Sequence, residues 1–124
     1  MDEITFEDFQ KVEIRIGTVV SAEVPEWSHW VMRIKVDLGE LGIKTAFSGI
    51  MKFYTPEDLV GKQFPFVVNL KPKNIGPEKE LSEVMMIMAT PTASQSGGQV
   101  DPADELKPIL FQLQEKVPNG TKVR

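Results

Sequence analysis

Apolar and charged side chains alternate strictly along residues 12–16. A period of two predicts a strand with one face in a core and the other face in water. The strand is expected to continue through Gly17 to residue 23, and a glycine inside a strand commonly marks a bulge or a sharp bend. A bend at Gly17 would let one long strand take part in two sheets.

The same alternation returns farther along the chain. Residues 31–39 and 43–49 alternate between apolar and polar positions on either side of a glycine-bounded turn. A fourth strand is expected at 63–70, where Pro65 favours an edge position or a bulge because proline has no N–H to donate. Residues 85–89 are almost all apolar, so they predict a fifth strand in an all-β domain.

Capping signals indicate two short helices. Residues 55–61 contain a threonine cap, a proline at the first helical position, acids in the first turn and a glycine stop. Residues 5–9 predict a helical turn with Thr5 as its N-cap. Five short strands with a helix between the third and the fourth are typical of a five-stranded OB-fold barrel. We expect a single domain over residues 1–124, with the barrel core at about residues 9–90.

The composition is that of a globular protein, with 41% hydrophobic and 26% charged residues. No apolar run approaches the ~20 residues that cross a bilayer, and the N-terminus is acidic where a signal peptide is basic. We therefore expect no membrane partner and a cytoplasmic location. The chain has no cysteine and a single histidine, His29, which argues against disulfides, thiolate chemistry and a histidine-based metal site. No metal, no cofactor and no enzymatic activity are expected.

The formal net charge of −4 by itself argues against nucleic acid as a partner, because neutralisation of phosphates supplies most of the affinity in such complexes. The negative excess is local, since four acidic residues fall within the first ten positions. Between Lys44 and Lys73 the balance reverses, with five lysines against two acids. A positive patch on an acidic protein is therefore compatible with the sequence.

Two phrases carry a resemblance to a known family. They are the run from Phe9 to Val20, which contains Val-Glu-Ile-Arg-Ile-Gly-Thr-Val-Val, and Val-Val-Asn-Leu-Lys-Pro-Lys at 67–73. Together they resemble the tRNA-binding domain family of stand-alone tRNA-binding proteins, the C-terminal domain of methionyl-tRNA synthetases and the CsaA-type export chaperone. The resemblance covers about residues 9–89 and resumes at residue 117. It implies an OB fold and a non-catalytic protein with tRNA as its partner.

In stand-alone members of this family, a C-terminal extension packs with the N-terminal arm against a second subunit. Residues 117–124 resemble that extension, so we interpret about residues 91–124 as used in dimerisation and expect a homodimer. The arm and the extension also carry more apolar surface than a five-stranded barrel needs. The side chains expected at the dimer interface are Phe6, Phe9, Leu110 and Phe111.

The motif Asn-Leu-Lys-Pro-Lys at 69–73 lies beside the RNA in tRNA-binding relatives. Lysines contact phosphates as point charges, and the asparagine amide can donate to and accept from a base edge or a ribose hydroxyl. A solvated turn punctuated by Pro72 is the alternative interpretation. The expected RNA-contacting residues are Lys52, Asn69, Lys71, Lys73, Ser82 and Met85, with Arg15, Lys35 and Lys44 as secondary electrostatic candidates.

The next motif of the relatives is Ser-Glu-Gly-Met, whereas this chain reads Ser-Glu-Val-Met at 82–85. A glycine permits close backbone approach or a positive φ, which a valine does not adopt cheaply. The variant at Val84, together with Ile-Gly-Pro at 75–77, resembles the chaperone branch of the family. Core filling is the expected role of at least two of the methionines at positions 85, 86 and 88.

The loop after the first strand contains Trp27 and Trp30. Such side chains can stack on unpaired bases, at about 1–3 kcal/mol each, or grip an apolar peptide, and they can equally cap the barrel mouth or join the dimer contact. Two functions remain open. The first is a non-catalytic tRNA-binding protein; the alternative is a CsaA-like chaperone that binds unfolded or export-bound polypeptides, with Trp27, Trp30 and Tyr54 lining an apolar cavity.

Overall fold

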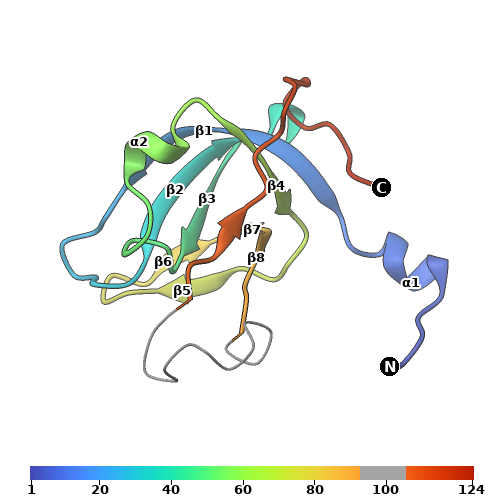
Figure 1. Cartoon of the computed structure of the whole chain (residues 1–124), viewed down its shortest axis with the longest axis horizontal. Coiled ribbons are helices and arrows are strands. Elements are labelled where there is room, and N and C mark those ends of the chain that lie inside the picture. Colours follow the sequence, from blue (N-terminus) through green and yellow to red (C-terminus); the bar gives the residue numbers. More distant parts are fainter. Residues whose placement is uncertain (93–105) are drawn as a thin grey trace.

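Five antiparallel strands form a nearly closed barrel in the computed structural model, which describes residues 1–92 and 106–124 (Figure 1). The strand order is β3-β2-β1-β4-β7, and it confirms the predicted OB-type barrel. The strands are β1 (Ile14–Glu23), β2 (Met32–Asp37), β3 (Ile43–Ser48), β4 (Gln63–Val67), β5 (Lys73–Ile75), β6 (Glu80–Ser82), β7 (Met85–Met86), β8 (Met88–Ala89) and β9 (Ile109–Leu110). The helices are α1 (Phe6–Gln10) and α2 (Pro56–Leu59), and a 3-10 turn, η1 (Gly39–Leu41), joins β2 to β3.

Strand β1 takes part in both sides of the barrel, because its first half pairs with β4 and its second half with β2. Gly17 lies near this change of partner, where an added Cβ would be 2.4 Å from Val36 Cγ2. Glycine therefore allows β1 and β2 to approach closely. The expectation at Gly17 was a bulge or a bend: a bulge there is wrong in position, because the shift in register falls between Val19 and Ser21. The expectation that one long strand takes part in two sheets is confirmed for the two sides of the barrel, because β1 changes partner at Thr18.

Strand β4 lies inside the sheet, between β1 and β7. The edge position or bulge expected from Pro65 is therefore wrong, and the register with β1 is unbroken. Val68 N–H donates to Glu13 C=O at 2.9 Å, and hydrogen-bonded positions alternate along an antiparallel ladder. Pro65 precedes Val68 by three residues, so it falls at a position where the ladder with β1 needs no N–H.

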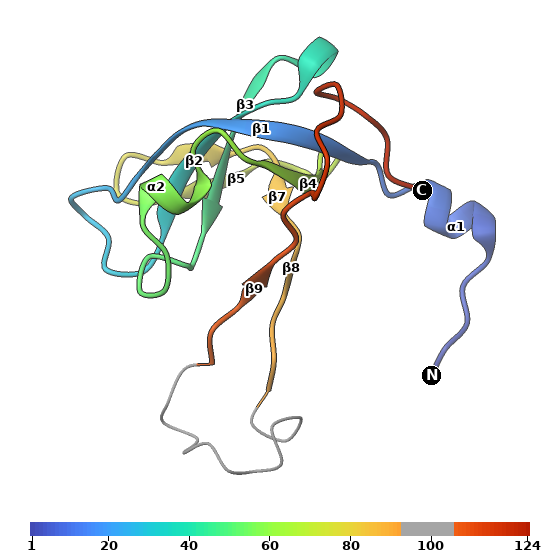
Figure 2. The same ribbon diagram turned by 45° about the horizontal axis from the view of Figure 1, so that its top comes forward.

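The single strand expected at residues 85–89 is divided into two. β7 pairs with β4, whereas β8 pairs with β9, and these two strands project from the barrel (Figure 2). A hairpin of β5 and β6 precedes them, and the sequence pattern did not predict it. Its strands are three residues long and mostly polar, which is too short for a clear period-two signal.

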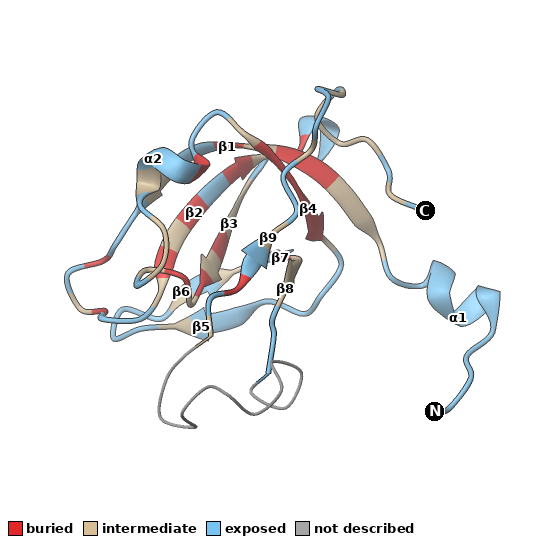
Figure 3. Ribbon diagram, viewed as in Figure 1, coloured by how far each residue is buried: buried red, intermediate tan, exposed pale blue. Residues whose placement is uncertain are grey.

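The core fills the inside of the barrel, where buried positions from β1, β2, β3 and β4 face one another (Figure 3). The predicted helix α2 adds Leu59, which is fully buried. The capping at its start is also confirmed, because Thr55 N–H donates to Asp58 Oδ2 at 2.8 Å. The largest fully buried side chains are Phe64, Phe66, Met32, Ile34, Leu38, Ile50, Leu59, Val19 and Val36.

The C-terminal segment lies beside the first half of β1, whereas the N-terminal helix lies beyond the start of that strand. Helix α1 stands away from the barrel and has no buried residue (Figure 1); its predicted cap is confirmed, because Asp8 N–H donates to Thr5 Oγ1 at 3.0 Å. Near the C-terminus, Gly120 N–H donates to Ile16 C=O at 2.7 Å, and Ile16 N–H donates to Thr121 C=O at 2.8 Å. Residues 93–105 of the segment interpreted as used in dimerisation lie outside the described residues.

Candidate nucleic-acid interface

One surface groove of about 240 Å³ brings together side chains from β3, from the segment after β4 and from the β5–β6 hairpin. We call it the lysine groove. It is lined by Phe47, Leu70, Lys71, Lys73, Ile75, Ser82, Glu83, Val84 and Met85. The two lysines of the first motif and the serine and methionine of the second motif therefore share one site.

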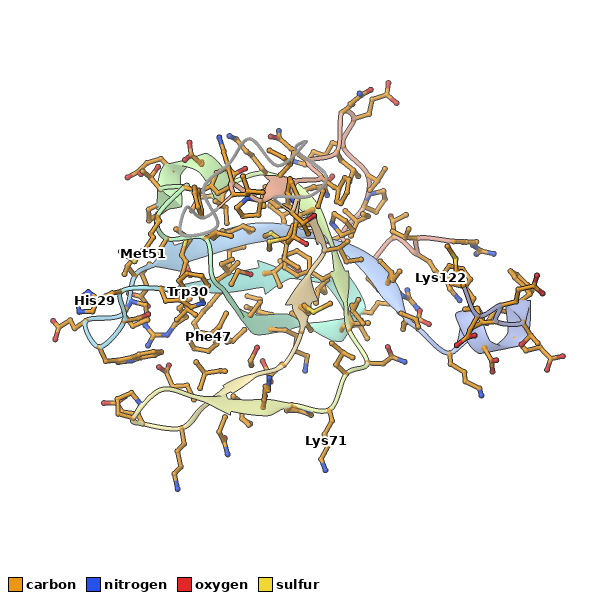
Figure 4. The ribbon with its side chains drawn as sticks, turned by 60° about the horizontal axis from the view of Figure 1, so that its bottom comes forward. His29, Trp30, Phe47, Met51, Lys71 and Lys122 are labelled. Carbon is orange, nitrogen blue, oxygen red and sulfur yellow. The ribbon has the colours of Figure 1, made fainter. Side chains whose placement is uncertain are left out.

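The lysine groove combines exposed ammonium groups with apolar surface. Lys71 and Lys73 are exposed, and Lys71 projects away from the barrel (Figure 4). Lys73 pairs with Ser82 across the hairpin, so a cation and a hydroxyl lie side by side on one face of it. Met85 is 49% exposed. This set of groups can hold a phosphate at the rim and an apolar or aromatic group beside it.

A second groove of about 290 Å³ adjoins the first and shares Leu70, Glu83 and Val84 with it. Lys44 lines this second groove. The secondary candidate Lys44 is therefore placed next to the lysine groove, and it extends the row of cations along the same side of the barrel.

Glu83 and Val84 close the barrel between β3 and the hairpin. Glu83 N–H donates to Thr45 C=O at 2.8 Å, and Thr45 N–H donates to Glu83 Oε2 at 2.9 Å. Val84 is buried in the core, and Lys79 is the one non-glycine residue with a positive φ in the described ranges. The valine that replaces the relatives' glycine therefore suffers no backbone strain, and its side chain fills the core.

The side-chain amide of Asn69 faces the N-terminal segment. Its Oδ1 accepts from Glu13 N–H at 2.9 Å, and its Nδ2 donates to Lys11 C=O at 2.6 Å. Both ends of the amide are thus engaged by backbone groups just before β1. In this arrangement Asn69 positions the chain around the site, and its amide is not presented to a base edge.

The other expected cations are not among the side chains that line the lysine groove. Arg15 donates to Glu13 Oε1 at 2.7 Å and to Gly120 C=O at 2.9 Å, which ties it to the C-terminal segment. Lys35 Nζ lies 3.5 Å from Thr45 Oγ1 on the outer face of β2 and β3. Lys52 Nζ lies 5.6 Å from the centroid of the Trp30 ring.

The two tryptophans have different surroundings. Trp27 lies against the hairpin, since a Cβ added at Gly76 would be 2.6 Å from its ring. Trp30 covers Gly49 and is 51% exposed, and Figure 4 shows it near His29 at one end of the molecule.

Tyr54 does not share these surroundings. It packs against the core, and its hydroxyl donates to Pro108 C=O at 2.6 Å. Lys107 Nζ lies 4.9 Å from the centroid of its ring. Tyr54 therefore belongs to the segment that leads into β9, and its neighbours differ from those of both tryptophans.

Two residues that matter to the groove were missed by the sequence reasoning. Phe47 lines it, and its ring centroid lies 6.2 Å from that of Trp27. Arg33 lies directly opposite Phe47 in the β2–β3 register. The available signal was an aromatic side chain, Phe47, on the outward-facing side of β3, which also carries Ile43 and Thr45, because a large apolar side chain on an outer face indicates a covering segment.

The side chains expected at a dimer interface are exposed to different degrees. Phe6 is 70% exposed and Phe9 40% exposed on α1, and their ring centroids are 6.4 Å apart. Phe111 is also exposed, whereas Leu110 packs against the core of its own chain. Met86 is buried in the core and Met88 packs against it, which confirms the core role expected for two of the methionines.

The described ranges also limit other kinds of site. No helix within them has the length and apolar character that a bilayer span requires. In the same ranges, no group of three or more His, Cys, Asp or Glu side chains is arranged to hold a metal ion.

Comparison with known proteins gives the family. A model described as "putative tRNA binding domain" matches residues 14–122. The chain is 37% identical over 123 residues to methionine–tRNA ligase 1 of Bacillus anthracis, which covers 99% of this chain and 16% of that protein. The chain therefore spans about a sixth of the length of the curated relatives that it matches.

Solved structures agree with this assignment over the whole chain. The chaperone CsaA from Bacillus anthracis str. Ames is 36% identical with a TM-score of 0.78, and the match covers 99% of this chain and 100% of that one. A MetRS-related protein from Pyrococcus horikoshii is 31% identical with a TM-score of 0.82, and both chains are covered completely. Because the family model also extends over nearly the whole barrel, this chain belongs to the family of putative tRNA-binding domains.

Proposed function

We propose that this chain is a non-catalytic tRNA-binding module that holds RNA against the lysine groove. The observation that carries the proposal is the convergence of Lys71, Lys73 and Ser82 on one groove with an apolar lining. The ammonium groups contact phosphates as point charges. The Ser82 hydroxyl can bond a ribose 2′-OH, which distinguishes RNA from DNA.

The neighbouring apolar surface suits an unpaired base. Phe47 and Met85 line the same groove, and aromatic or thioether side chains pack against the face of a base without reading its sequence. Glu83 also lines the groove, but its carboxylate accepts a hydrogen bond from Thr45 N–H, which lessens its repulsion of a phosphate. On this acidic chain we expect moderate affinity with a steep salt dependence.

The remaining candidates have supporting roles in this proposal. Lys44 adds a second contact along the adjoining groove, and Lys35 adds positive potential on the outer face of β2. Asn69 and Arg15 hold the segments that flank the site. Lys52 acts together with Trp30 as a further contact.

Polypeptide binding is the second candidate function. The observation in its favour is the likeness over the whole chain to a protein described as the chaperone CsaA. Exposed apolar side chains at Phe6, Ile109 and Phe111 also give an extended chain something to bind. We rank it second because these side chains lie on segments that we propose to be covered in a homodimer, whereas the lysine groove remains open.

The test is a titration of a tRNA by fluorescence anisotropy at low and near-physiological salt, with an unfolded protein as competitor. We expect saturable binding that weakens steeply with salt and that the competitor leaves unchanged. Replacing Lys71 and Lys73 by Ala should weaken binding and reduce the slope of log K against log salt by roughly one per lost phosphate contact. Lys116→Ala, in the exposed segment after β9, is the matched control and should leave the slope unchanged.

The competing outcomes are distinct. Absence of tRNA binding at low salt would overturn the RNA proposal. Binding of the unfolded protein, insensitive to salt and to both lysine substitutions, would move the polypeptide function to first place. Sedimentation of the same samples tests the homodimer, because Phe6→Ser should shift a dimer towards monomer. We also propose a cytoplasmic location, which the family match supports and which fractionation of cells would test.

A further inference from the structure

A row of side chains crosses three strands on the outer face of the barrel. The register places Glu23 of β1 opposite Arg33 of β2, and Arg33 opposite Phe47 of β3. Directly opposite side chains in an antiparallel sheet are close enough to interact. Arg33 therefore sits in the middle of the row, with an acid on one side and an aromatic ring on the other.

Arg33 also reaches the hairpin. Its Nη1 donates to Glu23 Oε1 at 2.7 Å, and its Nη2 donates to Glu80 Oε2 on β6. Its guanidinium carbon lies 5.8 Å from the centroid of the Phe47 ring. The Arg33 side chain is 16% exposed and that of Glu80 is 29% exposed, so the contact between them is partly shielded from water, whereas the Glu23 side chain is 63% exposed. Of the two carboxylates, Glu23 belongs to the barrel itself, whereas Glu80 joins the barrel to the hairpin.

The Glu80 contact is close to the groups proposed to bind RNA. In the hairpin register, Glu80 lies opposite Ile75, and the next pair on the same face is Ser82 opposite Lys73. At the turn of the hairpin, Gly76 lies against the ring of Trp27. The hairpin thus contacts Trp27 at its turn and Arg33 through Glu80, and both Trp27 and Arg33 pack against Phe47, the Trp27 ring at an interplanar angle of 41°. We call the ion pair between Arg33 and Glu80 the tie of the hairpin to the barrel.

We propose that Arg33 is a positioning residue for the RNA interface, which it serves by holding the β5–β6 hairpin through Glu80. The tie keeps Lys73 and Ser82 at a fixed distance from Lys71, which lies on the segment before the hairpin. A hairpin without the tie must be ordered when RNA binds, and this ordering reduces affinity. The inference rests on the proposed function for the role in RNA binding, but the tie itself can be measured without RNA.

Glu80→Gln and Glu23→Gln form a matched pair. Each substitution removes one negative charge and one charged acceptor from Arg33. Electrostatics alone would make either variant bind RNA slightly more tightly, because a negative charge near the phosphates is lost. If Glu80 holds the hairpin in place, Glu80→Gln should instead weaken RNA binding, and Glu23→Gln should not. Arg33→Lys is a third variant, which keeps the charge but cannot hold both carboxylates with a planar fork.

The experiment measures hydrogen exchange of the backbone amides in residues 73–82 and tRNA affinity at several salt concentrations, for the wild type and the three variants. We expect Glu80→Gln and Arg33→Lys to exchange faster in the hairpin and to bind tRNA roughly threefold to tenfold more weakly, as for loss of a partly shielded ion pair. The salt slope should stay at the wild-type value, because no phosphate contact is removed. Glu23→Gln should retain slow exchange and affinity.

Two results would overturn the inference. The first is an unchanged rate of hydrogen exchange in residues 73–82 of the Glu80→Gln variant, with thermal unfolding as a check that the variant is folded. This result would show that Glu80 does not hold the hairpin against the barrel. Equal losses of affinity in Glu80→Gln and Glu23→Gln would assign the effect to Arg33 in general and not to the hairpin. If the wild type fails to bind tRNA, the proposed function and the RNA role of Arg33 fall together, while the exchange data still decide whether the hairpin is tied.

Discussion

The side chain of Asn69 joins the segment after β4 to the start of β1, by accepting a hydrogen bond from Glu13 N–H at 2.9 Å. The same amide donates to Lys11 C=O at 2.6 Å. Helix α1 has no buried residue, so this amide is one of the contacts that fix its direction relative to the barrel. The asparagine of the RNA motif therefore links the groove lysines, two and four residues later, to the N-terminal arm.

Asn69→Ala should lower the free energy of unfolding by about 1–2 kcal/mol, since two hydrogen bonds to backbone groups are lost. Urea unfolding measures this loss, and hydrogen exchange of residues 6–13 should become faster because the arm is released. Asn74→Ala, an exposed asparagine on β5, is the matched control and should change stability by less than about 0.5 kcal/mol. Unaltered exchange in the arm would contradict a positioning role for Asn69.

Local signals in the sequence predicted the barrel well. The alternation at 12–16 and 31–37 and the caps at Thr5 and Thr55 depend on neighbours within a few residues, and the structure confirms each of them. The resemblance to the tRNA-binding family added the position of the lysines. Part of the lysine groove could thus be predicted from the sequence.

Contacts between residues far apart in the sequence were not predicted. Arg33 has the pattern of an ordinary polar position in an alternating strand, because Glu80 lies 47 residues away. The hairpin has strands of only three residues, which give no clear periodic pattern. A proline such as Pro65 ordinarily indicates an edge strand. Whether it fits inside a sheet depends on which residues of β4 hydrogen-bond to β1, and this register cannot be read from the residues around Pro65. These features follow from register and from contacts between distant segments, which no local pattern encodes.

Gly76→Ala and Gly61→Ala separate backbone strain from packing. Both glycines have positive φ, +78° and +84°, so alanine should destabilise each variant by about 1–2 kcal/mol. At Gly61 an added Cβ meets nothing within 4 Å, whereas at Gly76 it would lie 2.6 Å from the Trp27 ring. Gly76→Ala should therefore destabilise more and should also shift the tryptophan fluorescence in the folded state. Equal effects on stability and emission would contradict the packing of Trp27 on the hairpin.

Asp58 should make the stability of α2 depend on pH. The hydrogen bond from Thr55 N–H is the main cause that lowers the pKa of Asp58 below its ordinary value of 3.8. A carboxylate with a depressed folded-state pKa stabilises the fold above its unfolded pKa, and this contribution is lost as the pH falls through the folded-state value. The difference in thermal midpoint between the wild type and Asp58→Ala should therefore be constant from pH 5 to 7 and should shrink below about pH 4. A difference that stays constant down to pH 2 would exclude this linkage.

Gln63 fastens the C-terminal segment to the barrel, and its removal should release that segment. Its Nε2 donates to Val117 C=O at 2.7 Å and to Asn119 Oδ1 at 3.0 Å, while its Oε1 accepts from Val117 N–H at 3.0 Å. Gln63 is buried, so Gln63→Leu leaves backbone groups without partners and should lower the free energy of unfolding by about 2 kcal/mol.

The amides of residues 117–123 should then exchange faster, because the pairing of Thr121 with β1 loses the anchor that precedes it. Gln114→Leu, at an exposed position of the same segment, controls for the change of side chain and should leave both readouts near the wild-type values. If the homodimer uses the C-terminal segment, Gln63→Leu should also weaken self-association in sedimentation measurements, whereas Gln114→Leu should not. A stable Gln63→Leu variant with slow exchange in residues 117–123 would show that the pairing with β1 alone holds the segment in place.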